Sequence, residues 1–185
     1  MQIQFFKPNP RNTGHACSFY LSPKDNRFYG CLIKQDGWNA AKRTGSFAQN
    51  VDNPQKKVNV KFSNTEIGGI LDSLETNREF SAYHDGATTQ FSTSIKFAPY
   101  MKDGAQVGYS FMVTKSSKED STNKTSFVIG LSFPEGRLLR EYLSFLLKKS
   151  FEAEIANFNS SLNQKKNESA TQSSGQSVEA ATIEL

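Results

Sequence analysis

The sequence has few of the residues that hydrolytic and metal-dependent enzymes use. It contains only two histidines and two cysteines in 185 residues. GxSxG, a glycine-rich phosphate loop ending in Lys-Ser/Thr, HExxH and CxxC are all missing. A hydrolytic centre needs a nucleophile, a base and an orienting group, and without a motif the sequence gives no support for one. We therefore expect no enzymatic activity and no cofactor.

Long apolar segments and an export signal are also missing. No run approaches the roughly 20 apolar residues that cross a bilayer as a helix. The start, MQIQFFKPNPRN, has neither the apolar stretch nor the small-residue cleavage site of a secretory signal. These features predict an intracellular protein with reduced thiols at Cys17 and Cys31, cytoplasmic or nucleoid-associated, with no membrane partner.

Charge is distributed unevenly along the chain. The 22 lysines and arginines and the 18 aspartates and glutamates give a net charge of +4. Residues 1–166 hold all 22 basic side chains against 15 acidic ones, whereas residues 167–185 hold three acidic side chains. A basic body with an acidic tail favours a polyanionic partner. A basic surface that only keeps the protein soluble is the alternative.

Short runs of alternating or aromatic-rich sequence dominate the chain before residue 157. Bounded by turn residues such as Asp85-Gly86 and Asp103-Gly104, they are typical of antiparallel strands. The 15 phenylalanines and six tyrosines exceed what a small core usually needs, so we expect some rings to face a ligand. The predicted strands span residues 15–22, 27–35, 45–49, 57–62, 79–84, 89–98, 107–115 and 125–132.

Two helices are predicted to interrupt these strands. FSNTE at 62–66 and LSFPE at 131–135 each place a serine three residues before a glutamate, which is the pattern of a capping box. Aligning the serines also pairs Ile70 with Leu139. The sequence therefore predicts an α+β fold in which two four-stranded antiparallel sheets are each followed by a helix, ββββα twice.

The two predicted helices differ in apolar surface. The first, from about residue 64 to 74, has a single stripe that one sheet can cover, and its Gly68-Gly69 pair indicates close backbone packing. The second has an apolar arc of roughly 200°, more than one sheet can bury. We expect the excess to pack between subunits, although a buried helix in a monomer would show the same pattern. The predicted interface residues are Leu138, Leu139, Tyr142, Leu143, Phe145, Leu146 and Leu147.

From about Asn157 the composition changes to Asn, Ser, Gln, Lys and Thr with few apolar residues. Such a segment cannot bury enough surface to offset the entropy of ordering it. We therefore divide the chain into a domain at residues 1–156 and a disordered tail at 157–185. The acidic and apolar tip of the tail, residues 180–185, is a candidate docking peptide for a protein partner.

The histidines and cysteines offer two alternative interpretations. His15, Cys17, Cys31 and His84 would form a zinc site, but their spacing matches no known zinc motif. His84-Asp85 has the pairing of a general base, yet no third catalytic partner is apparent. Because this pair lies where a strand meets an Asp-Gly turn, we interpret it as structural.

Basic and aromatic side chains on strands favour nucleic-acid binding. Alternation along residues 57–62 places the valines inward and the lysines outward. Lysines that neutralise phosphates, beside rings on which bases stack, are what a single-strand binder needs. The alternative is that the lysines solubilise a sheet and the rings are core. The candidate binding residues are Lys57, Asn59, Lys61, Lys96, Tyr109 and Lys115 on strands, and Trp38, Lys42, Arg43 and Phe47 on a predicted surface loop.

Three segments resemble Whirly proteins. VKFSNTEIGGILDSLETNREFSAYHDG, residues 60–86, resembles that family's first-helix region, in which a Leu-Ser-x-x-Glu-apolar-Gly start leads to a Glu-Phe-x-x-His-Asp strand. IKFAPYMKDGAQVGYSFMVTKS, residues 95–116, resembles its Asp-Gly strand pair. FVIGLSFPEGRLLREYLSFLLKKSF, residues 127–151, is similar to its last strand and helix. The similarity covers about residues 56–151.

This resemblance implies a homotetramer with its helices at the centre, which binds single-stranded DNA along sheet surfaces and between neighbouring subunits, with little sequence preference and no catalysis. Related folds in mitochondrial guide-RNA-binding proteins and positive-cofactor coactivators make RNA a second candidate ligand. The family's Lys-Gly-Lys-Ala-Ala-Leu motif is matched only loosely by TGHAC at 13–17, so we do not expect the higher assemblies built through it.

The expected function is therefore a single-stranded DNA-binding protein of replication, recombination or repair. The absence of a transit peptide and the acidic tail favour a bacterial or viral protein over an organellar one. An oligomeric structural or protein-interaction module without nucleic-acid function is the alternative.

Overall fold

The computed structural model describes residues 2–87, 89–120 and 122–175. The chain forms two compact units, residues 1–147 and 148–185. Its elements are β1 (Gln2–Lys7), β2 (His15–Ser22), β3 (Arg27–Lys34), β4 (Gly37–Asn39), β5 (Thr44–Ser46), the 3₁₀ turn η1 (Ala48–Asn50), β6 (Lys57–Phe62), α1 (Asn64–Thr76), β7 (Phe80–His84), β8 (Phe91–Lys102), β9 (Ala105–Ser117), β10 (Lys124–Leu131) and α2 (Phe133–Gly175).

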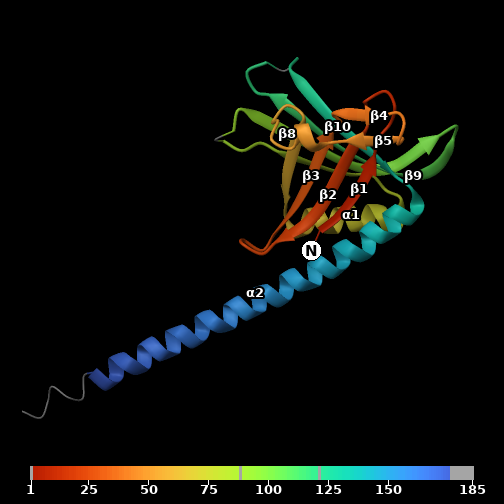
Figure 1. Cartoon of the computed structure of the whole chain (residues 1–185). Coiled ribbons are helices and arrows are strands. Elements are labelled where there is room, and N and C mark those ends of the chain that lie inside the picture. Colours follow the sequence, from red (N-terminus) through yellow and green to blue (C-terminus); the bar gives the residue numbers. More distant parts are fainter. Residues whose placement is uncertain (1, 88, 121, 176–185) are drawn as a thin grey trace, which may run out of the picture. The chain divides into compact units, whose positions relative to one another are not determined.

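Two four-stranded antiparallel sheets form the first unit. The first sheet has the strand order β1-β2-β3-β6 and the second has the order β10-β9-β8-β7. Strands β1, β2 and β3 lie side by side in Figure 1, and a short ribbon of β4 and β5 belongs to the link between β3 and β6. Because a helix follows each sheet, the predicted fold class is confirmed.

One strand of the first sheet differs from the prediction. Residues 45–49 were predicted as one of its four strands, but β5 covers only Thr44–Ser46 and pairs with β4 alone. The fourth place belongs to β1, which pairs with β2 along its whole length. The segment QIQFFK alternates over too few residues to be recognised as a strand without its partner.

The two sheets share one core centred on Phe111 of β9. Its ring centroid lies 5.2 Å from that of Phe19 and 6.4 Å from that of Phe62, both of the first sheet. Phe97 of its own sheet is 6.2 Å away. All four rings are at most 1% exposed, so much of the aromatic content serves packing.

Both helices begin at the predicted serines. Ser63 Oγ accepts a hydrogen bond from the Glu66 N–H at 3.2 Å, and the Glu66 carboxylate accepts one from the Ser63 N–H at 2.8 Å. At the start of α2 the Glu135 carboxylate accepts a bond from the Ser132 N–H at 2.7 Å. These contacts satisfy N–H groups that a helix start leaves without partners.

Each of these glutamates also contacts a basic side chain on a strand of the other half. Glu66 Oε1 lies 2.6 Å from His84 Nε2 of β7. Both carboxylate oxygens of Glu135 lie 2.6 Å from Lys7 Nζ of β1. The helix after the first sheet is thus bound to the first strand of the second sheet, and the helix after the second sheet to the first strand of the first. His84 therefore has a structural partner in Glu66.

Close packing of α1 involves one of its two glycines. The helix buries Ile70 and Leu74. A Cβ at Gly69 would lie 2.3 Å from the ring of Phe80, whereas a Cβ at Gly68 would meet nothing within 4 Å. The predicted close approach of the glycine pair is therefore confirmed for Gly69 and is wrong for Gly68.

The part of α2 in the first unit covers the shared core. Of the seven residues predicted at a subunit interface, four are buried within the chain itself and Leu147 packs against them. Leu138 and Phe145 remain 57% and 45% exposed. Assembly through this helix stays a prediction, and it now depends on these two side chains. The four buried residues are Leu139, Tyr142, Leu143 and Leu146.

In the second unit α2 continues to Gly175. Residues 157–175, predicted as part of a disordered tail, are therefore helical, while the tip at 180–185 lies outside the described residues. The prediction relied on the polar composition of the segment and overlooked the spacing of its few apolar residues. Exposed apolar side chains recur in a stripe at i, i+4, i+7 and i+11, a spacing that favours a helix. Of the helices described, none has the length and apolar character that spanning a bilayer requires. The stripe consists of Phe151, Ile155, Phe158 and Leu162.

Candidate nucleic-acid interface

The outer face of the first sheet, turned away from the core, carries basic, aromatic and amide side chains. Along β6, Val58 and Val60 are buried while Lys57, Asn59 and Lys61 point outward, as predicted. Strand register arranges this outer face in three rows that each end on β6. The rows are Phe6, Ala16, Ile33 and Lys57; Gln4, Ser18, Cys31 and Asn59; and Gln2, Tyr20, Tyr29 and Lys61.

The third row combines stacked rings with a cation. The rings of Tyr20 and Tyr29 stack with centroids 5.5 Å apart, and Lys61 Nζ lies 5.9 Å from the centroid of Tyr29. Asp25 accepts a 2.8 Å hydrogen bond from the Tyr29 hydroxyl and forms a 3.2 Å ion pair with Lys61. Hydrogen bonds from Ser22 and Tyr29, with the nearby Lys61, lower the pKa of Asp25 to about 2. The carboxylate therefore stays ionised and holds the lysine beside the ring.

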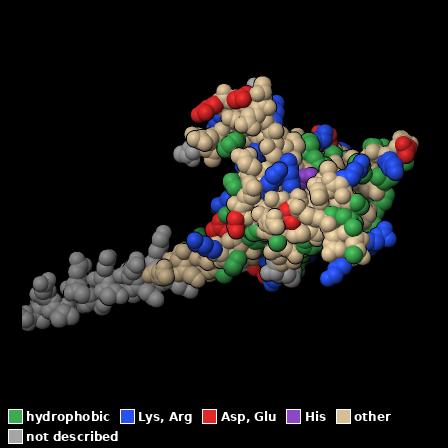
Figure 2. Space-filling model, turned by 45° about the horizontal axis from the view of Figure 1, so that its top comes forward, with side chains coloured by type: hydrophobic (Ala, Val, Ile, Leu, Met, Phe, Trp, Pro, Cys, Tyr) green, Lys and Arg blue, Asp and Glu red, His purple; other side chains and the backbone are tan. Residues whose placement is uncertain are grey.

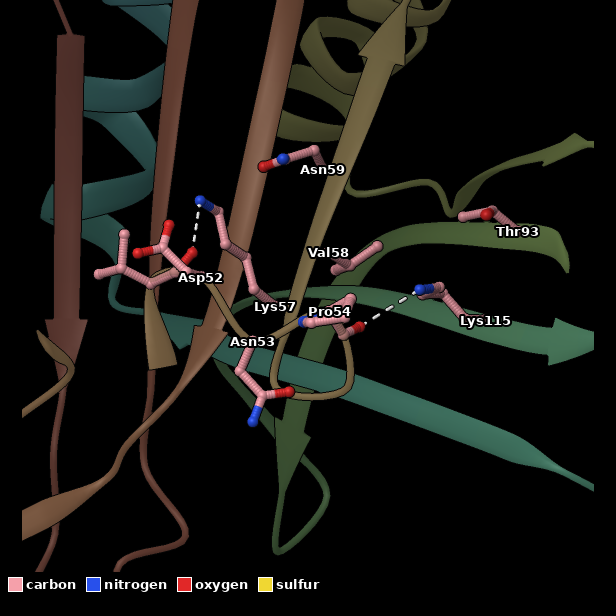
Figure 3. A pocket seen from close by; sticks show the side chains of 9 residues that line it. Asp52, Asn53, Pro54, Lys57, Val58, Asn59, Thr93 and Lys115 are labelled. Carbon is pink, nitrogen blue, oxygen red and sulfur yellow. Dashed lines mark hydrogen bonds between the residues drawn. The ribbon is translucent and has the colours of Figure 1, made fainter. Parts of the chain in front are cut away.

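A cavity of about 320 Å³, the polar cavity, lies beside the first residues of β6 (Figure 3). Lys57 Nζ donates to the Val51 carbonyl at 2.9 Å, and Lys115 Nζ donates to the Pro54 carbonyl at 3.3 Å. An ammonium has three N–H donors, so these bonds leave donors for an anion. The cavity is lined by Val51, Asp52, Asn53, Pro54, Lys57, Val58, Asn59, Thr93 and Lys115.

Three predicted binding residues from both sheets therefore border one cavity. Lys57 and Asn59 come from β6 and Lys115 from β9. Lys115 also lies 4.7 Å from the ring centroid of Phe91, which gives this cavity an aromatic neighbour. A charged ammonium over a ring is favourable because the ring face is electron-rich.

A second cavity of about 210 Å³, the apolar cavity, is set in the outer face of the first sheet. The predicted Phe47 lines it and packs against Phe6, with ring centroids 5.8 Å apart. Sequence reasoning missed Phe6, Tyr20 and Tyr29 as candidates. The signal was present in the alternation of HACSFYLS and RFYGCLIK, since every second residue of a strand shares a face.

Tyr109 is corrected from a binding residue to a core residue. It is only 8% exposed, its ring lies 6.0 Å from that of Phe97, and its hydroxyl donates to the Leu74 carbonyl at 3.1 Å. The face that it shares with Phe111 and Val113 is turned toward the first sheet. Lys115 lies on the same face but beyond the core, where it reaches the polar cavity.

The other predicted residues lie elsewhere. Trp38 belongs to β4, and Lys42 and Arg43 are exposed on the turn that joins β4 to β5. Lys96 is on the outer face of the second sheet, where it forms a 2.6 Å ion pair with Glu79. Lys and Arg side chains recur among hydrophobic ones over the face in Figure 2. None of these four residues lines either of the two cavities.

The four alternative zinc ligands are not brought together. Cys17 faces the core and Cys31 the outer face of the first sheet, because Cys31 is the cross-strand partner of the outward-facing Ser18. His84 lies on the second sheet against Glu66. Across the described residues no group of three or more His, Cys, Asp or Glu side chains could hold a metal ion. Burial raises the pKa of both thiols, which keeps them protonated.

No protein-family model matches the sequence, and no curated protein matches it significantly. The solved structures that are similar in fold include those of WHY3 and WHY1 from Arabidopsis thaliana, each with a TM-score of 0.59. WHY3 is 18% identical over 85% of this chain, and WHY1 is 16% identical over 87%; both matches cover 92% of the solved chain. The chain thus has a Whirly-type fold, as the sequence resemblance predicted.

Proposed function

We propose that this Whirly-type fold binds single-stranded nucleic acid on the outer face of its first sheet, without sequence specificity and without catalysis. The observation that carries the proposal is the edge strand β6, where Lys61 lies beside the stacked rings of Tyr20 and Tyr29 and Lys57 points to the same face. Lysines neutralise phosphates and rings stack on bases, and neither contact requires a particular base.

The same arrangement favours a single strand over a duplex. Lys57 and Lys61 point to the same side and are separated by roughly 13 Å, at about 3.3 Å per strand residue. A duplex would meet these lysines with its phosphates but keep its bases stacked inside. Only a single strand offers base faces to the tyrosines, so the rings add affinity for that form alone.

Within this proposal the ligand is DNA and the protein acts in replication, recombination or repair; RNA is the alternative ligand. Support comes from the fold and from the net positive charge of residues 1–166. The acting form is a homotetramer assembled through the exposed Leu138 and Phe145 of α2, and the end of the chain recruits a protein partner. The protein works inside a bacterial cell or in a virus-infected one. Light scattering tests the assembly, and a monomer would contradict it.

A binding titration tests the function. Fluorescent oligo-dT, single-stranded RNA and duplex DNA of equal length are titrated with the full chain over a salt series. Binding of oligo-dT is expected in the nanomolar-to-micromolar range at low salt and should weaken steeply as salt rises, because counterion release drives the association. Equal affinity for oligo-dT and duplex would overturn the single-strand assignment. No binding of any of the three would favour a structural or protein-interaction module.

A further inference from the structure

The polar cavity and the apolar cavity meet at Lys57. Both are lined by Val51 and Lys57, so they are neighbours on the surface of the protein. We propose that together they form one nucleotide site, in which a nucleobase of the bound strand enters the apolar cavity and its phosphate lies in the polar cavity. This inference rests on the proposed function and gives it a location for one nucleotide per chain.

Small side chains make the apolar cavity possible. Its floor contains Ala16, Ser18 and Cys31. Ala16 and Ser18 are successive outward residues of β2, and Cys31 is the cross-strand partner of Ser18 on β3. Larger side chains surround them, among them Phe6 and Ile33. The volume of about 210 Å³ far exceeds the roughly 30 Å³ share of one water molecule in the liquid. A flat ring can therefore enter it.

The walls of the apolar cavity suit a base of any identity. Phe6 is 55% exposed and is tilted by 58° against Phe47, so its ring is open to cover by another ring. A base placed there would stack on the Phe6 ring, and this contact would remove the touching faces of the base and of the ring from water. Gln2 and Gln4 also line the cavity. Their amides each offer a donor and an acceptor, and so can satisfy the polar edge of either a purine or a pyrimidine.

The polar cavity suits the phosphate of the same nucleotide. Lys57 and Lys115 reach it from different sheets, and both are held by carbonyl groups of the loop at Val51 and Pro54. Two cations against the single acidic residue in the lining, Asp52, leave the cavity positively charged. Since Lys57 borders both cavities, it can bind the phosphate of a nucleotide whose base is in the neighbouring cavity.

Filling the apolar cavity without changing its charge tests the site. Ser18→Leu places a larger side chain on the floor, and the matched control Ser94→Leu makes the same change on an exposed outward position of β8. The expected result is that Ser18→Leu lowers the affinity for oligo-dT by roughly tenfold while the slope of log affinity against log salt stays the same, because no phosphate contact is lost. Ser94→Leu should leave both quantities unchanged.

Cys31 provides a second measurement on the unmodified protein. It lies half-buried in the floor, whereas Cys17 is only 3% exposed and serves as the unreactive reference. Oligo-dT should slow the modification of Cys31 by a maleimide several-fold. An abasic oligonucleotide of the same length, which keeps the phosphates, should protect it much less. This comparison decides the question even if Ser18→Leu does not fold.

The outcomes separate the nucleotide site from the function on which it rests. If the unmodified protein binds oligo-dT, but Ser18→Leu binds it equally well or Cys31 reacts at the same rate with and without it, the nucleotide site is overturned and the function stands. If the unmodified protein does not bind oligo-dT, the proposed function fails, and the site with it.

Discussion

The first sheet with α1 and the second sheet with α2 repeat one succession of elements, yet their outer faces differ. The first presents Lys57 and Lys61 on its edge strand, with Lys61 beside the stacked tyrosines. The second presents serines and threonines, with Tyr83 64% exposed and with Lys96, which like Lys61 is paired with an acid. In both sheets the inward residues meet the same core and are constrained by packing. The difference shows that alternation leaves the other side of each strand free to acquire a separate role.

The capping glutamates at the two helix starts, Glu66 and Glu135, can also be compared between the two halves. Burial raises the pKa of Glu66, but hydrogen bonds from Ser63 and His84 outweigh it and hold the pKa below its usual value. Burial also raises the pKa of Glu135, where hydrogen bonds from Lys7 and the capping serine again give a net lowering. Groups with lowered carboxyl pKa values stabilise the fold at neutral pH and lose that contribution on strong acidification. Each half thus uses a capping glutamate that contacts a basic side chain of the other half, His84 for Glu66 and Lys7 for Glu135.

The largest expected effect tests whether the two halves are one folding unit. Phe111→Ala should lower the free energy of unfolding by about 3–5 kcal/mol, because its ring contacts phenylalanines of both sheets. Denaturant unfolding is followed by far-UV circular dichroism and by the fluorescence of Trp38, which lies in the first half. Both signals should shift together. Unchanged unfolding at Trp38 would separate the halves, and Tyr83→Ala on the surface should cost no more than about 0.5 kcal/mol.

Charge reversal compares the two outer faces directly. Lys57→Glu with Lys61→Glu should weaken oligo-dT binding at least roughly 50-fold at about 50 mM salt and reduce the salt slope by about 1.4, taking about 0.7 per phosphate of a single strand. The matched pair on the second sheet is Lys96→Glu with Lys124→Glu. We expect little change from this pair. A loss of oligo-dT affinity similar to that of the first pair would mean that both sheets bind DNA and that Lys96 is a binding residue.

The contact between α1 and the second sheet offers a matched pair of substitutions. Gly69→Ala should lower the free energy of unfolding by about 1–3 kcal/mol, because its Cβ would overlap the Phe80 ring. Gly68→Ala, with open space around it, should raise this free energy by up to about 1 kcal/mol through helix propensity. Urea unfolding of both variants measures the difference. Equal effects would mean that Phe80 moves aside and does not fix the distance between helix and strand.

Sequence predicted the features that depend on local pattern. The two capping serines follow from a spacing of three residues, and the outward position of Lys57, Asn59 and Lys61 follows from alternation along one strand. Both are properties of a single element. They therefore needed no knowledge of what packs against it.

Features that depend on pairing between strands could not be predicted. The apolar cavity exists because Ser18 of β2 meets Cys31 of β3, and register of this kind is absent from either segment alone. Tyr109 was misassigned for a related reason. The inward face of β9 carries aromatic, aliphatic and charged side chains. The pattern therefore does not show which end of that face is buried against the first sheet. Only the position of the other sheet decides that Tyr109 is buried while Lys115 reaches a cavity.

The smallest expected effect concerns His15 of β2, in the first half. Burial lowers the pKa of His15, as does the charge of Lys34, and its Nε2 is buried without a hydrogen-bond partner. The folded state therefore holds fewer protons at His15 than the unfolded state, and stability should decline as pH falls below the usual histidine range near about 6.5. Melting temperatures between about pH 7.5 and 5.5 measure this decline while the carboxylates remain ionised. His15→Gln should flatten this decline; an unchanged decline in the variant would mean that a group other than His15 causes it.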